Sequence, residues 1–519
     1  MGGVAPLPRV PVHVLLELRA ALDKQSGIPQ QTRLLYRALA LSPELRVCGL
    51  LQSSTHALGQ GVPVGRPGRP VRLAAHRQIN RLSRVIIMLE QKYARSILSP
   101  VAALVRRIIG GHEVLTRFDP SHFRDYIWQR LFARSLPASD FDLVTGTDYR
   151  IARTPWTAMH ICGLISRWLG HALYPRLDTA GFNVLLAETP YPATVSGATR
   201  LVIRYHDAVP LLQPHTISDR RYHQLFHYQA LRRNVGSGAW FVCVSEATRR
   251  DLVAVFPEAA DRSVTIHNVV SHDYFDEPSS PERVWPIARS RVNARVRQSL
   301  SPPARTSFFE GSDPVRAPQY LLIVSTVEPR KNHLTLLSAW EQLRARQLPD
   351  MKLIIVGTLG WHHAPIVRKL HPWMELGQVT MLEDVPAPDL RVLYKHAAAT
   401  VCPSFAEGFD LSGVESMMSG GVVVASDIPV HREVYGDGAL YFDPRSPGDL
   451  ARVLSELLLT PSEGLRAGLI AKGASVARRY TTEVILPKWR DFLLAVAGEV
   501  HPARARTAEE RPLTSQGAI

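Results

Sequence analysis

Short apolar runs of strand length alternate with segments of helical periodicity in both halves of this 519-residue chain. In the first half, strand patterns occur at 10–18 and 142–144, among others. In the second half, a buried strand pattern at 320–324 precedes a helical pattern at 333–346. A chain of this length is too long for one hydrophobic core. The alternation predicts the α/β class, with two Rossmann-like parallel-sheet domains that face each other across a cleft and bind ligands at the carboxyl ends of their strands.

The expected boundary between these domains is a segment at 276–317, which is rich in Pro, Ser and Arg and has little apolar periodicity. Such a composition is typical of a linker. The remaining segments follow from it. They are an N-terminal domain at 1–275 with a basic insertion at 56–135, a C-terminal domain at 318–480, a C-terminal helix at 481–500 and a disordered tail at 501–519.

The composition is that of a globular protein, with 45% hydrophobic residues and a mean hydropathy of −0.04. No run of about 18 apolar residues occurs, so a membrane-spanning helix is not expected. The first residues, 1–11, lack the apolar core of a secretory signal. The cysteines are scattered without a CxxC pair, which argues against disulfides and zinc and favours a reducing cytoplasm. They are Cys48, Cys162, Cys243 and Cys402.

One basic segment stands out within the formal net charge of +15. From Arg66 to Arg107 there are ten Arg and Lys residues but a single acid, Glu90. The partners that suit such a block are anionic lipid, nucleic acid or another polyanion, and the alternative is a solvated helix face. Arginines alternate with apolar residues at helical spacing from 77 to 95, as in a basic amphipathic helix. Because no nucleic-acid motif is present, we expect no nucleic acid partner but an anionic membrane surface, with the protein cytoplasmic and peripheral on the inner face of the cell membrane.

Two carboxylates eight positions apart, Glu407 and Glu415, form the most informative motif of the chain. Apolar residues at helical spacing accompany them, namely Leu411, Val414 and Met418. The helix is expected to begin near 409–411, where free backbone N–H groups and a positive dipole end form an anion site. Glu415 then lies about one turn in, roughly 6 Å along the helix axis. A carboxylate near a phosphate-binding helix start commonly holds ribose hydroxyls, so the motif predicts a nucleotide-sugar site.

Two adjacent cations, Arg330 and Lys331, lie on the loop between the strand pattern at 320–324 and the helical pattern at 333–346. Arg offers a planar fork of N–H donors and Lys a compact point charge, and both suit a leaving diphosphate. Such a pair on its own is more often an exposed surface charge. Its position after a buried strand, in the same domain as the two carboxylates, favours a role in diphosphate binding.

Four motifs in this order resemble glycosyltransferase family 4, which comprises retaining nucleotide-sugar transferases of the GT-B fold and includes bacterial mannosyltransferases. They are Glu328-Pro329-Arg330-Lys331-Asn332, Gly357-x-x-Gly360-Trp361, Glu407-x7-Glu415 and 426–434. The resemblance is strongest over 318–480 and weaker at 10–40 and 183–275. It is absent from 56–135 and 276–317. It implies that the N-terminal domain binds the acceptor and the C-terminal domain the nucleotide sugar.

The resemblance also implies roles for individual residues of the C-terminal half. Arg330 and Lys331 would bind the donor diphosphate and assist its departure. Glu407 would lie beside the donor sugar, as a catalytic residue. Glu415 would accept hydrogen bonds from the ribose hydroxyls.

In the N-terminal half, the resemblance points to a loop glycine and a histidine at a strand end. Gly27 would lie on the loop that approaches the donor or acceptor. His206, directly after the strand pattern at 201–203, would face the transferred sugar as a catalytic residue. A lone histidine is more often structural, but this position favours the functional interpretation, and Asp207 is a weaker candidate.

The chain departs from the family pattern beside the expected phosphate, where the resemblance places the backbone N–H groups of Asp410 and Leu411. Asp410 stands where the family usually has Gly, and Ser412-Gly413 and Gly420-Gly421 also differ. A carboxylate here opposes phosphate binding unless its side chain turns away or accepts a sugar hydroxyl. The departures leave the donor open.

The expected activity is that of a retaining hexosyltransferase of polysaccharide biosynthesis, which moves a hexose from a nucleotide diphosphate sugar to a glycan or lipid-linked acceptor. GDP-mannose is the first donor to consider, and UDP-glucose and other hexose donors stay open. No Asp-x-Asp motif is placed to bind the diphosphate through a metal, so neither a metal nor another cofactor is expected. The alternatives are a catalytically inactive GT-B protein that binds nucleotide sugar or carbohydrate, and a GT-B sugar-nucleotide epimerase.

Overall fold

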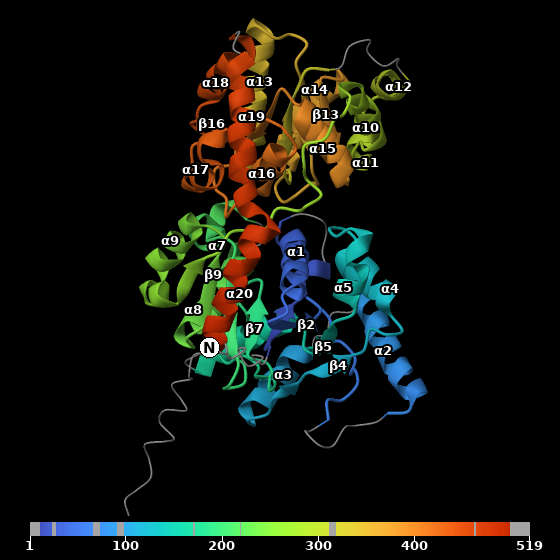
Figure 1. The fold of residues 1–519 in the computed structure, drawn as a ribbon, viewed down its shortest axis with the longest axis vertical. Helices are drawn as coiled ribbons and strands as arrows, with labels where there is room; N and C mark the ends of the chain where they lie inside the picture. Colours follow the sequence, from blue (N-terminus) through green and yellow to red (C-terminus); the bar gives the residue numbers. More distant parts are fainter. Residues whose placement is uncertain are drawn as a thin grey trace, which may run out of the picture.

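The computed structural model contains two α/β domains stacked along the long axis of the molecule (Figure 1). It describes residues 11–22, 27–65, 73–90, 98–169, 172–217, 220–310, 318–460 and 463–498. The N-terminal domain lies in the lower half of Figure 1 and the C-terminal domain in the upper half. Each domain has its own sheet of mainly or wholly parallel strands, which confirms the predicted pair of Rossmann-like domains.

The N-terminal sheet has eight strands in the order β10-β9-β8-β7-β1-β2-β5-β4. They are β1 (Val12–Glu17), β2 (Leu45–Leu51), β4 (Thr116–Phe118), β5 (Asp148–Ile151), β7 (Val184–Ala187), β8 (Arg200–Tyr205), β9 (Trp240–Cys243) and β10 (Ser263–Thr265). Every neighbouring pair is parallel except β4 and β5. All four residues of β7 are buried, as a parallel strand with helices on both faces of its sheet requires.

Helices pack on this sheet, and a small sheet pairs β3 (Glu113–Val114) with β6 (Leu177–Asp178). The helices are α1 (Ile28–Ala40), α2 (Ala75–Glu90), α3 (Ser99–Ile108), α4 (Arg124–Ile127), α5 (Phe141–Thr145), α6 (Trp156–Ile165), α7 (Val209–Leu212), α8 (Arg220–Gly236) and α9 (Glu246–Val255). Gly27 caps α1 with φ of +63°, a conformation that favours glycine, and Pro29 follows in the first turn. The turn aims the N-terminus of α1 at the C-terminal domain (Figure 1).

The C-terminal sheet is wholly parallel, in the order β13-β12-β11-β14-β15-β16. Its strands are β11 (Tyr320–Val324), β12 (Lys352–Val356), β13 (Val379–Leu382), β14 (Ala399–Cys402), β15 (Val423–Ser426) and β16 (Ala439–Phe442). Its helices are α13 (His333–Arg346), α14 (Ala364–Glu375), α15 (Ala387–His396), α16 (Leu411–Met418), α17 (Pro429–Tyr435), α18 (Pro447–Leu459) and α19 (Glu463–Ala477). The helix expected after Glu407 is therefore α16, and it begins at Leu411 as predicted.

The last helix, α20 (Thr482–Gly498), crosses back from the C-terminal domain to the N-terminal one (Figure 1). Its buried side chains Ile485, Trp489 and Leu493 belong to the same core as the strands β1 and β7. The helix predicted at 481–500 is thus confirmed over 482–498, and it joins the two domains. The tail predicted at 501–519 lies outside the described residues.

The prediction of an irregular linker at 276–317 is wrong over its described part. It contains α10 (Val284–Ser290), α11 (Ala294–Ser299) and α12 (Pro302–Glu310). Val284 and Val296 are buried in cores of the C-terminal domain, and the backbone N–H of Asn293 donates to Met381 at 2.9 Å. These helices are short: α10 buries three residues and α11 one, which are too few for an apolar pattern to repeat. This part therefore belongs to the C-terminal domain.

The segment at 56–135 is built into the N-terminal domain. Its strand β4 extends the main sheet, and Leu82 and Val85 of α2 lie in the main core together with Phe132. The basic amphipathic helix expected from 77 onward is α2, although residues 91–97 lie outside the described ranges. The insertion therefore adds to an existing core and does not form a separate arm.

A strand was expected at 142–144, but these residues form the short helix α5, and the neighbouring strand β5 begins at Asp148. Val144 is buried. A three-residue segment with one or two apolar residues is too short to show whether they recur with the period of a strand or of a helix. Within the described ranges, no helix combines the length and apolar character needed to cross a bilayer.

Candidate active site

A cavity of about 440 Å³ lies between the two domains, a size typical of small-molecule sites. Its walls come from the N-terminus of α1, the loop after β8, the loops after β11 and β12, and the loop before α16. Every site residue proposed from the sequence lines this one cavity. They are Gly27, His206, Arg330, Lys331, Glu407, Asp410, Leu411 and Glu415.

At one end of the cavity, Glu407 holds both cations. Its Oε2 accepts a hydrogen bond from Arg330 Nη1 at 2.9 Å and its Oε1 one from Lys331 Nζ at 2.5 Å. Arg330 also donates to the Ala406 carbonyl at 2.7 Å and to Glu328 at 3.0 Å. These contacts use three of the five N–H donors of the guanidinium and one of the three of the ammonium. Both cations therefore keep donors for a ligand.

The ion pairs keep this end of the cavity charged. Burial alone would raise the pKa of Glu407, but Arg330 and Lys331 outweigh it and hold the pKa below its usual range. Burial would likewise lower the pKa of Lys331, but the Glu407 carboxylate raises it above its usual range. The three groups are ionised together, so the two positive charges are fixed in place before any ligand arrives.

The loop that carries the cations is fixed by Asn332, which follows them in the motif. Asn332 adopts a left-handed conformation with φ of +57°, which Asn tolerates better than most residues. Its side-chain amide donates to the carbonyls of Pro403 and Pro444, each at 2.9 Å. The backbone N–H of Phe405 in turn donates to the Arg330 carbonyl at 2.9 Å. The asparagine thus joins the cation loop to the loop that carries Glu407.

Asp410 caps the helix α16 instead of presenting its charge to the cavity. It has φ of +63°, a conformation that favours glycine. Its Oδ1 accepts from Ser412 Oγ at 2.7 Å and from the Ser412 backbone N–H at 3.3 Å. Its Oδ2 lies 3.2 Å from His431 Nε2. Burial would raise its pKa, but Lys331, His431 and Ser412 hold the pKa well below its usual range, so Asp410 is ionised and its charge is compensated locally.

Glu415 occupies the other end of the cavity and has no cation beside it among the described residues. Its Oε1 accepts from Gln30 Nε2 at 3.2 Å and its Oε2 from Tyr394 OH at 3.1 Å. Burial raises the pKa of this carboxyl to about 7, although both hydrogen bonds oppose the shift. Gln30 belongs to α1, so this hydrogen bond crosses from one domain to the other.

The N-terminal wall of the cavity is formed at the end of β8. His206 Nε2 lies 3.1 Å from Glu188 Oε2, a fully buried carboxylate that follows β7. The backbone of the C-terminal domain approaches closely here, because a Cβ at Gly408 would lie 1.8 Å from the His206 carbonyl oxygen. Glycine at 408 is therefore what allows the Glu407 loop to reach His206 across the cleft.

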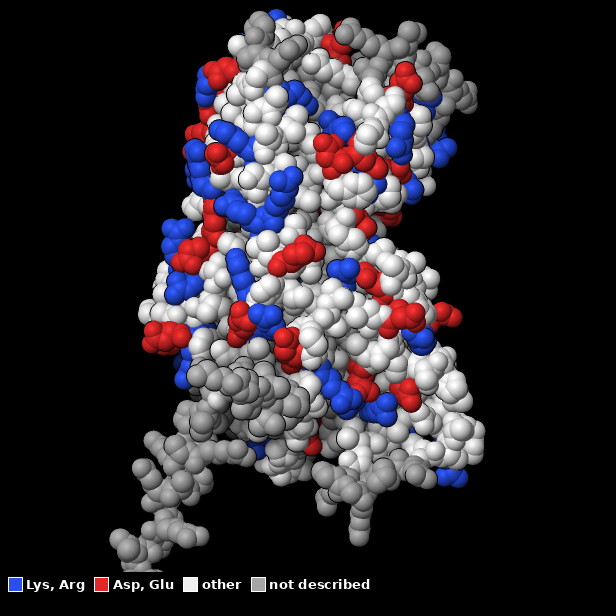
Figure 2. Space-filling view, viewed as in Figure 1, with Lys and Arg blue, Asp and Glu red and all other residues white. Residues whose placement is uncertain are grey.

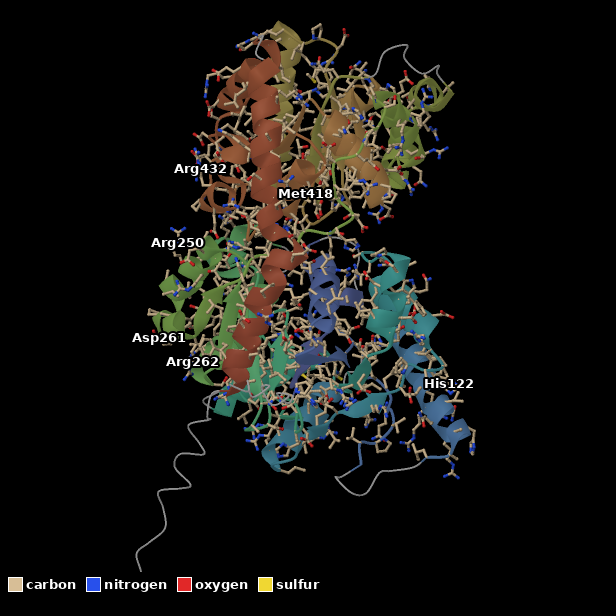
Figure 3. All side chains as sticks on the ribbon, viewed as in Figure 1. His122, Arg250, Asp261, Arg262, Met418 and Arg432 are labelled. Carbon is tan, nitrogen blue, oxygen red and sulfur yellow. The ribbon has the colours of Figure 1, made fainter. Side chains whose placement is uncertain are left out.

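No residue of the motif at 426–434 lines the cavity, although its His431 supports Asp410 and its Glu433 joins the two domains. Its Glu433 accepts from the first backbone N–H groups of α9, Glu246 at 2.7 Å and Ala247 at 3.0 Å, and from His267 Nε2 at 2.8 Å. Arg432 lies at the outer edge of the C-terminal domain (Figure 3) and pairs with Asp427 at 2.7 Å. Glu433 thus joins the domains on the α9 side.

Several lining residues carried no recognisable signal in the sequence. Gln30 lies in the first turn of α1, three residues after Gly27, and its place next to a predicted loop glycine is the only signal that could have pointed to a role in the site. Arg134, from the segment at 56–135, also lines the cavity, as does Tyr274. Neither lies in a motif, so only the folded chain identifies them. Among the described residues, no group of three or more His, Cys, Asp or Glu side chains is arranged to hold a metal ion.

Comparison with known proteins adds a family match over part of the chain. Residues 305–475 match the family model described as "Glycosyl transferases group 1". The O-antigen chain mannosyltransferase B of Escherichia coli is 29% identical over 256 residues, which are 49% of this chain and 60% of that protein. The phosphatidyl-myo-inositol mannosyltransferase of Mycobacterium tuberculosis is 30% identical over 176 residues, 33% of this chain and 45% of that protein. The chain spans 17% to 60% of the length of the first curated relatives it matches.

Two solved structures share the whole fold. The sucrose-phosphate synthase of Thermosynechococcus elongatus superposes with a TM-score of 0.53 at 14% identity and covers 94% of this chain and 100% of that one. HepE of Anabaena, solved in complex with UDP, superposes with a TM-score of 0.51 at 15% identity and covers 93% and 100%. At such identities the likeness concerns the fold. The chain therefore has the GT-B fold, and its residues 305–475 match the group 1 glycosyl transferases.

Proposed function

We propose that the chain is a retaining hexosyltransferase that uses a nucleotide diphosphate sugar. The observation that carries this proposal is the pair of partly buried cations, Arg330 and Lys331, held by one carboxylate in an interdomain cavity beside the start of α16. Fixed positive charges that need no rearrangement are what the developing charge of a leaving diphosphate requires. The match of residues 305–475 to group 1 glycosyl transferases supports the same assignment.

The donor would extend across the cavity from the cations at Glu407 to the carboxyl of Glu415. Its diphosphate would accept hydrogen bonds from the remaining donors of Arg330 and Lys331 and from backbone N–H groups near Leu411. Its ribose hydroxyls would bind Glu415 and displace the Gln30 amide. The sugar would lie towards Glu407 and His206, where the two domains meet. No metal ion is required in this scheme, because the two side chains carry the positive charge that a metal would otherwise supply.

The transfer would take place on one face of the sugar. The bond from the anomeric carbon to the phosphate oxygen breaks, and the bond to the acceptor oxygen forms on the same side. The acceptor proton passes to the departing phosphate oxygen, and a nucleoside diphosphate is released. Glu188 orients the His206 ring at 3.1 Å, so that the ring forms a fixed wall for the sugar. Closure of the cleft excludes water and strengthens each of these charge interactions.

Mannose from GDP-mannose is the donor that we propose first, because the curated relatives include O-antigen chain mannosyltransferases. UDP-glucose and other hexose donors are the alternatives to test. The acceptor would be a glycan or a lipid-linked glycan, and the protein would work in the cytoplasm against the inner face of the cell membrane. The basic composition of the segment from Arg66 to Arg107 supports that location.

A donor panel tests the proposal directly. Purified protein is mixed with GDP-mannose, UDP-glucose and other nucleotide sugars, and both the shift in unfolding temperature and the release of nucleoside diphosphate are measured. A true donor stabilises the native state by mass action and releases nucleoside diphosphate slowly without acceptor. Lys331→Ala should lose both effects. Lys472→Ala, a half-exposed lysine of α19, serves as the matched control. Stabilisation without turnover on any donor and acceptor would instead favour a catalytically inactive binding protein.

A further inference from the structure

The helix α3, at the far end of the N-terminal domain, exposes a continuous apolar face. The side chains on this face are Leu98, Val101, Val105, Ile108 and Ile109. Leu98 is 77% exposed, Ile109 76%, and the two valines 53% each. These residues recur at intervals of three and four, so they lie on one side of the helix. Monomeric proteins rarely leave such a contiguous patch uncovered unless it binds something.

The opposite side of α3 is already packed. Pro100 and Ala103 are buried, and the helix lies against α6. The neighbouring helix α2 behaves differently, because its apolar residues Leu82, Val85 and Leu89 are buried in the domain core. The amphipathic helix recognised in the sequence is therefore α2, and of its apolar residues Ile79 and Ile87 are exposed, whereas α3 leaves five large apolar side chains exposed on one side within the described residues.

Arg106 flanks the apolar face, whereas Arg107 lies four residues after the buried Ala103, on the packed side of α3. Arg106 and Arg107 stand in the last turn of α3, and residues 98–112 contain no Asp or Glu. Burial, followed by repulsion from Arg176 and Arg233, lowers the pKa of Arg107. Arg107 Nε is buried without a hydrogen-bond partner among the described residues. The nearest acid in sequence, Glu113, is occupied by the backbone N–H groups of Arg153 and Thr154 at 2.6 and 2.8 Å.

A surface that binds α3 would not block the interdomain cavity. In Figure 1 the helix lies at the end of the N-terminal domain that is remote from the C-terminal domain, whereas the cavity lies between the two. On the face shown in Figure 2, Lys and Arg side chains are interspersed with Asp and Glu over both domains. Positive charge alone therefore does not single out a surface. The combination of exposed apolar side chains and a flanking arginine distinguishes α3.

We propose that α3 docks the protein on an anionic lipid surface, with Leu98, Val101, Val105, Ile108 and Ile109 in the interfacial region and Arg106 at the headgroup phosphates. An interfacial helix needs this pairing of an apolar face with basic residues. This inference rests on the proposed membrane location and specifies α3 as the part of the protein that contacts the membrane. It is independent of donor chemistry, so a failure of vesicle binding leaves the transfer assay unaffected. Because docking is remote from the cleft, the reacting end of a membrane-anchored acceptor stands away from the bilayer.

Vesicle sedimentation with the full chain tests this surface. Vesicles of phosphatidylcholine alone and with about 30% phosphatidylglycerol are compared at about 50 mM and 500 mM NaCl. The wild type should bind the anionic vesicles at low salt and release them at high salt. Ile108→Asn with Ile109→Asn should weaken binding at least about tenfold, because two apolar side chains leave the interface. Arg106→Gln should weaken it about fivefold at low salt only, the equivalent of about 1 kcal/mol per basic residue.

Matched controls use exposed residues of the C-terminal domain. Leu376→Asn, at a position 65% exposed, and Arg346→Gln should bind vesicles like the wild type. Unfolding temperatures establish that each variant is folded, and Val105→Asn provides a second test should the double variant be destabilised. Binding that ignores lipid charge and salt would overturn the proposal, as would no binding at all. A dimer that the Ile108 and Ile109 variant dissociates would also overturn it, because a second copy would then cover the face.

Discussion

The two ends of the interdomain cavity each contain a buried glutamate of the same motif, yet their surroundings differ. Glu407 lies between Arg330 and Lys331 and is held ionised. Glu415, eight residues further on, interacts with the uncharged donors of Gln30, Tyr394 and Tyr274, and burial raises its pKa to about 7. One end is a fixed ion cluster, and the other is a titrating hydrogen-bond acceptor.

This difference shows that a shared motif does not give two carboxylates the same chemistry. At Glu407, the charges of Arg330 and Lys331 offset the free-energy cost of desolvating the carboxylate. At Glu415, hydrogen bonds offset only part of that cost, so the carboxyl keeps its proton to a higher pH. The first arrangement suits the stabilisation of charge on a leaving group. The second suits the recognition of neutral hydroxyls, which can replace the Gln30 amide without bringing a charge into the pocket.

The largest effect is expected from Glu407→Gln. The change leaves two partly buried cations without their shared counter-charge, although Arg330 keeps Glu328 as a partner at 3.0 Å, so the free energy of unfolding should fall by about 3 kcal/mol. Urea unfolding at pH 7.5, at about 25 °C, measures the loss. Addition of a nucleoside diphosphate should recover part of it, because phosphate oxygens then face the same cations. An unchanged urea midpoint would show that the ion cluster contributes little and would remove the contrast between the two ends.

Lys331→Ala should reduce turnover by about two to three powers of ten, the cost of removing one donor aimed at developing charge. Steady-state release of nucleoside diphosphate measures the effect, with Lys472→Ala as the control. The fold should persist, because Glu407 keeps Arg330 as a partner. A near-normal rate would show that the cationic end binds something other than the leaving group.

Glu415→Gln should raise the free energy of unfolding at neutral pH, whereas Glu407→Gln should lower it. The folded protein retains the Glu415 proton up to about pH 7 and the unfolded chain loses it near pH 4.5, so this residue reduces stability as pH rises through that window. Above pH 7 the free energy of unfolding of the variant should exceed that of the wild type by about 1–3 kcal/mol, and the two should converge near pH 4.

For Glu407 the pKa is lowered, so its contribution to stability is present above pH 4.5 and lost as pH falls below it. Unfolding free energies measured across pH give both profiles, and parallel profiles for the wild type and the Glu415 variant would contradict the assignment.

The smallest effect is expected from Gln30→Ala, which removes a single hydrogen bond worth about 1 kcal/mol. Because that bond lowers the pKa of Glu415, its loss should move the pH dependence of stability upward from pH 7. Gln347→Ala, at an exposed position of the C-terminal domain, provides the control. If the midpoint of the pH dependence of stability does not move, Gln30 and Glu415 are not coupled across the cleft.

Much of the architecture follows from local pattern. The alternation of strands and helices predicted both domains, and the Glu407 motif predicted the start of α16 at Leu411. The failures involve short elements. The helices within 276–317 and the helix α5 each contain too few residues for an apolar period to repeat, so their packing partners, and not their own sequence, determine their conformation.

The sequence by itself determined the fold class, the cation loop and several of the residues that line the cavity, because each of these depends on contacts within a strand–loop–helix unit. The tertiary structure alone decided what surrounds them. Gln30 reaches Glu415 from the other domain, the His206 carbonyl requires glycine at 408, and α20 returns to the N-terminal core. The physical reason is that charge, desolvation and close approach depend on neighbours distant in the chain, and one-dimensional periodicity carries no information about them.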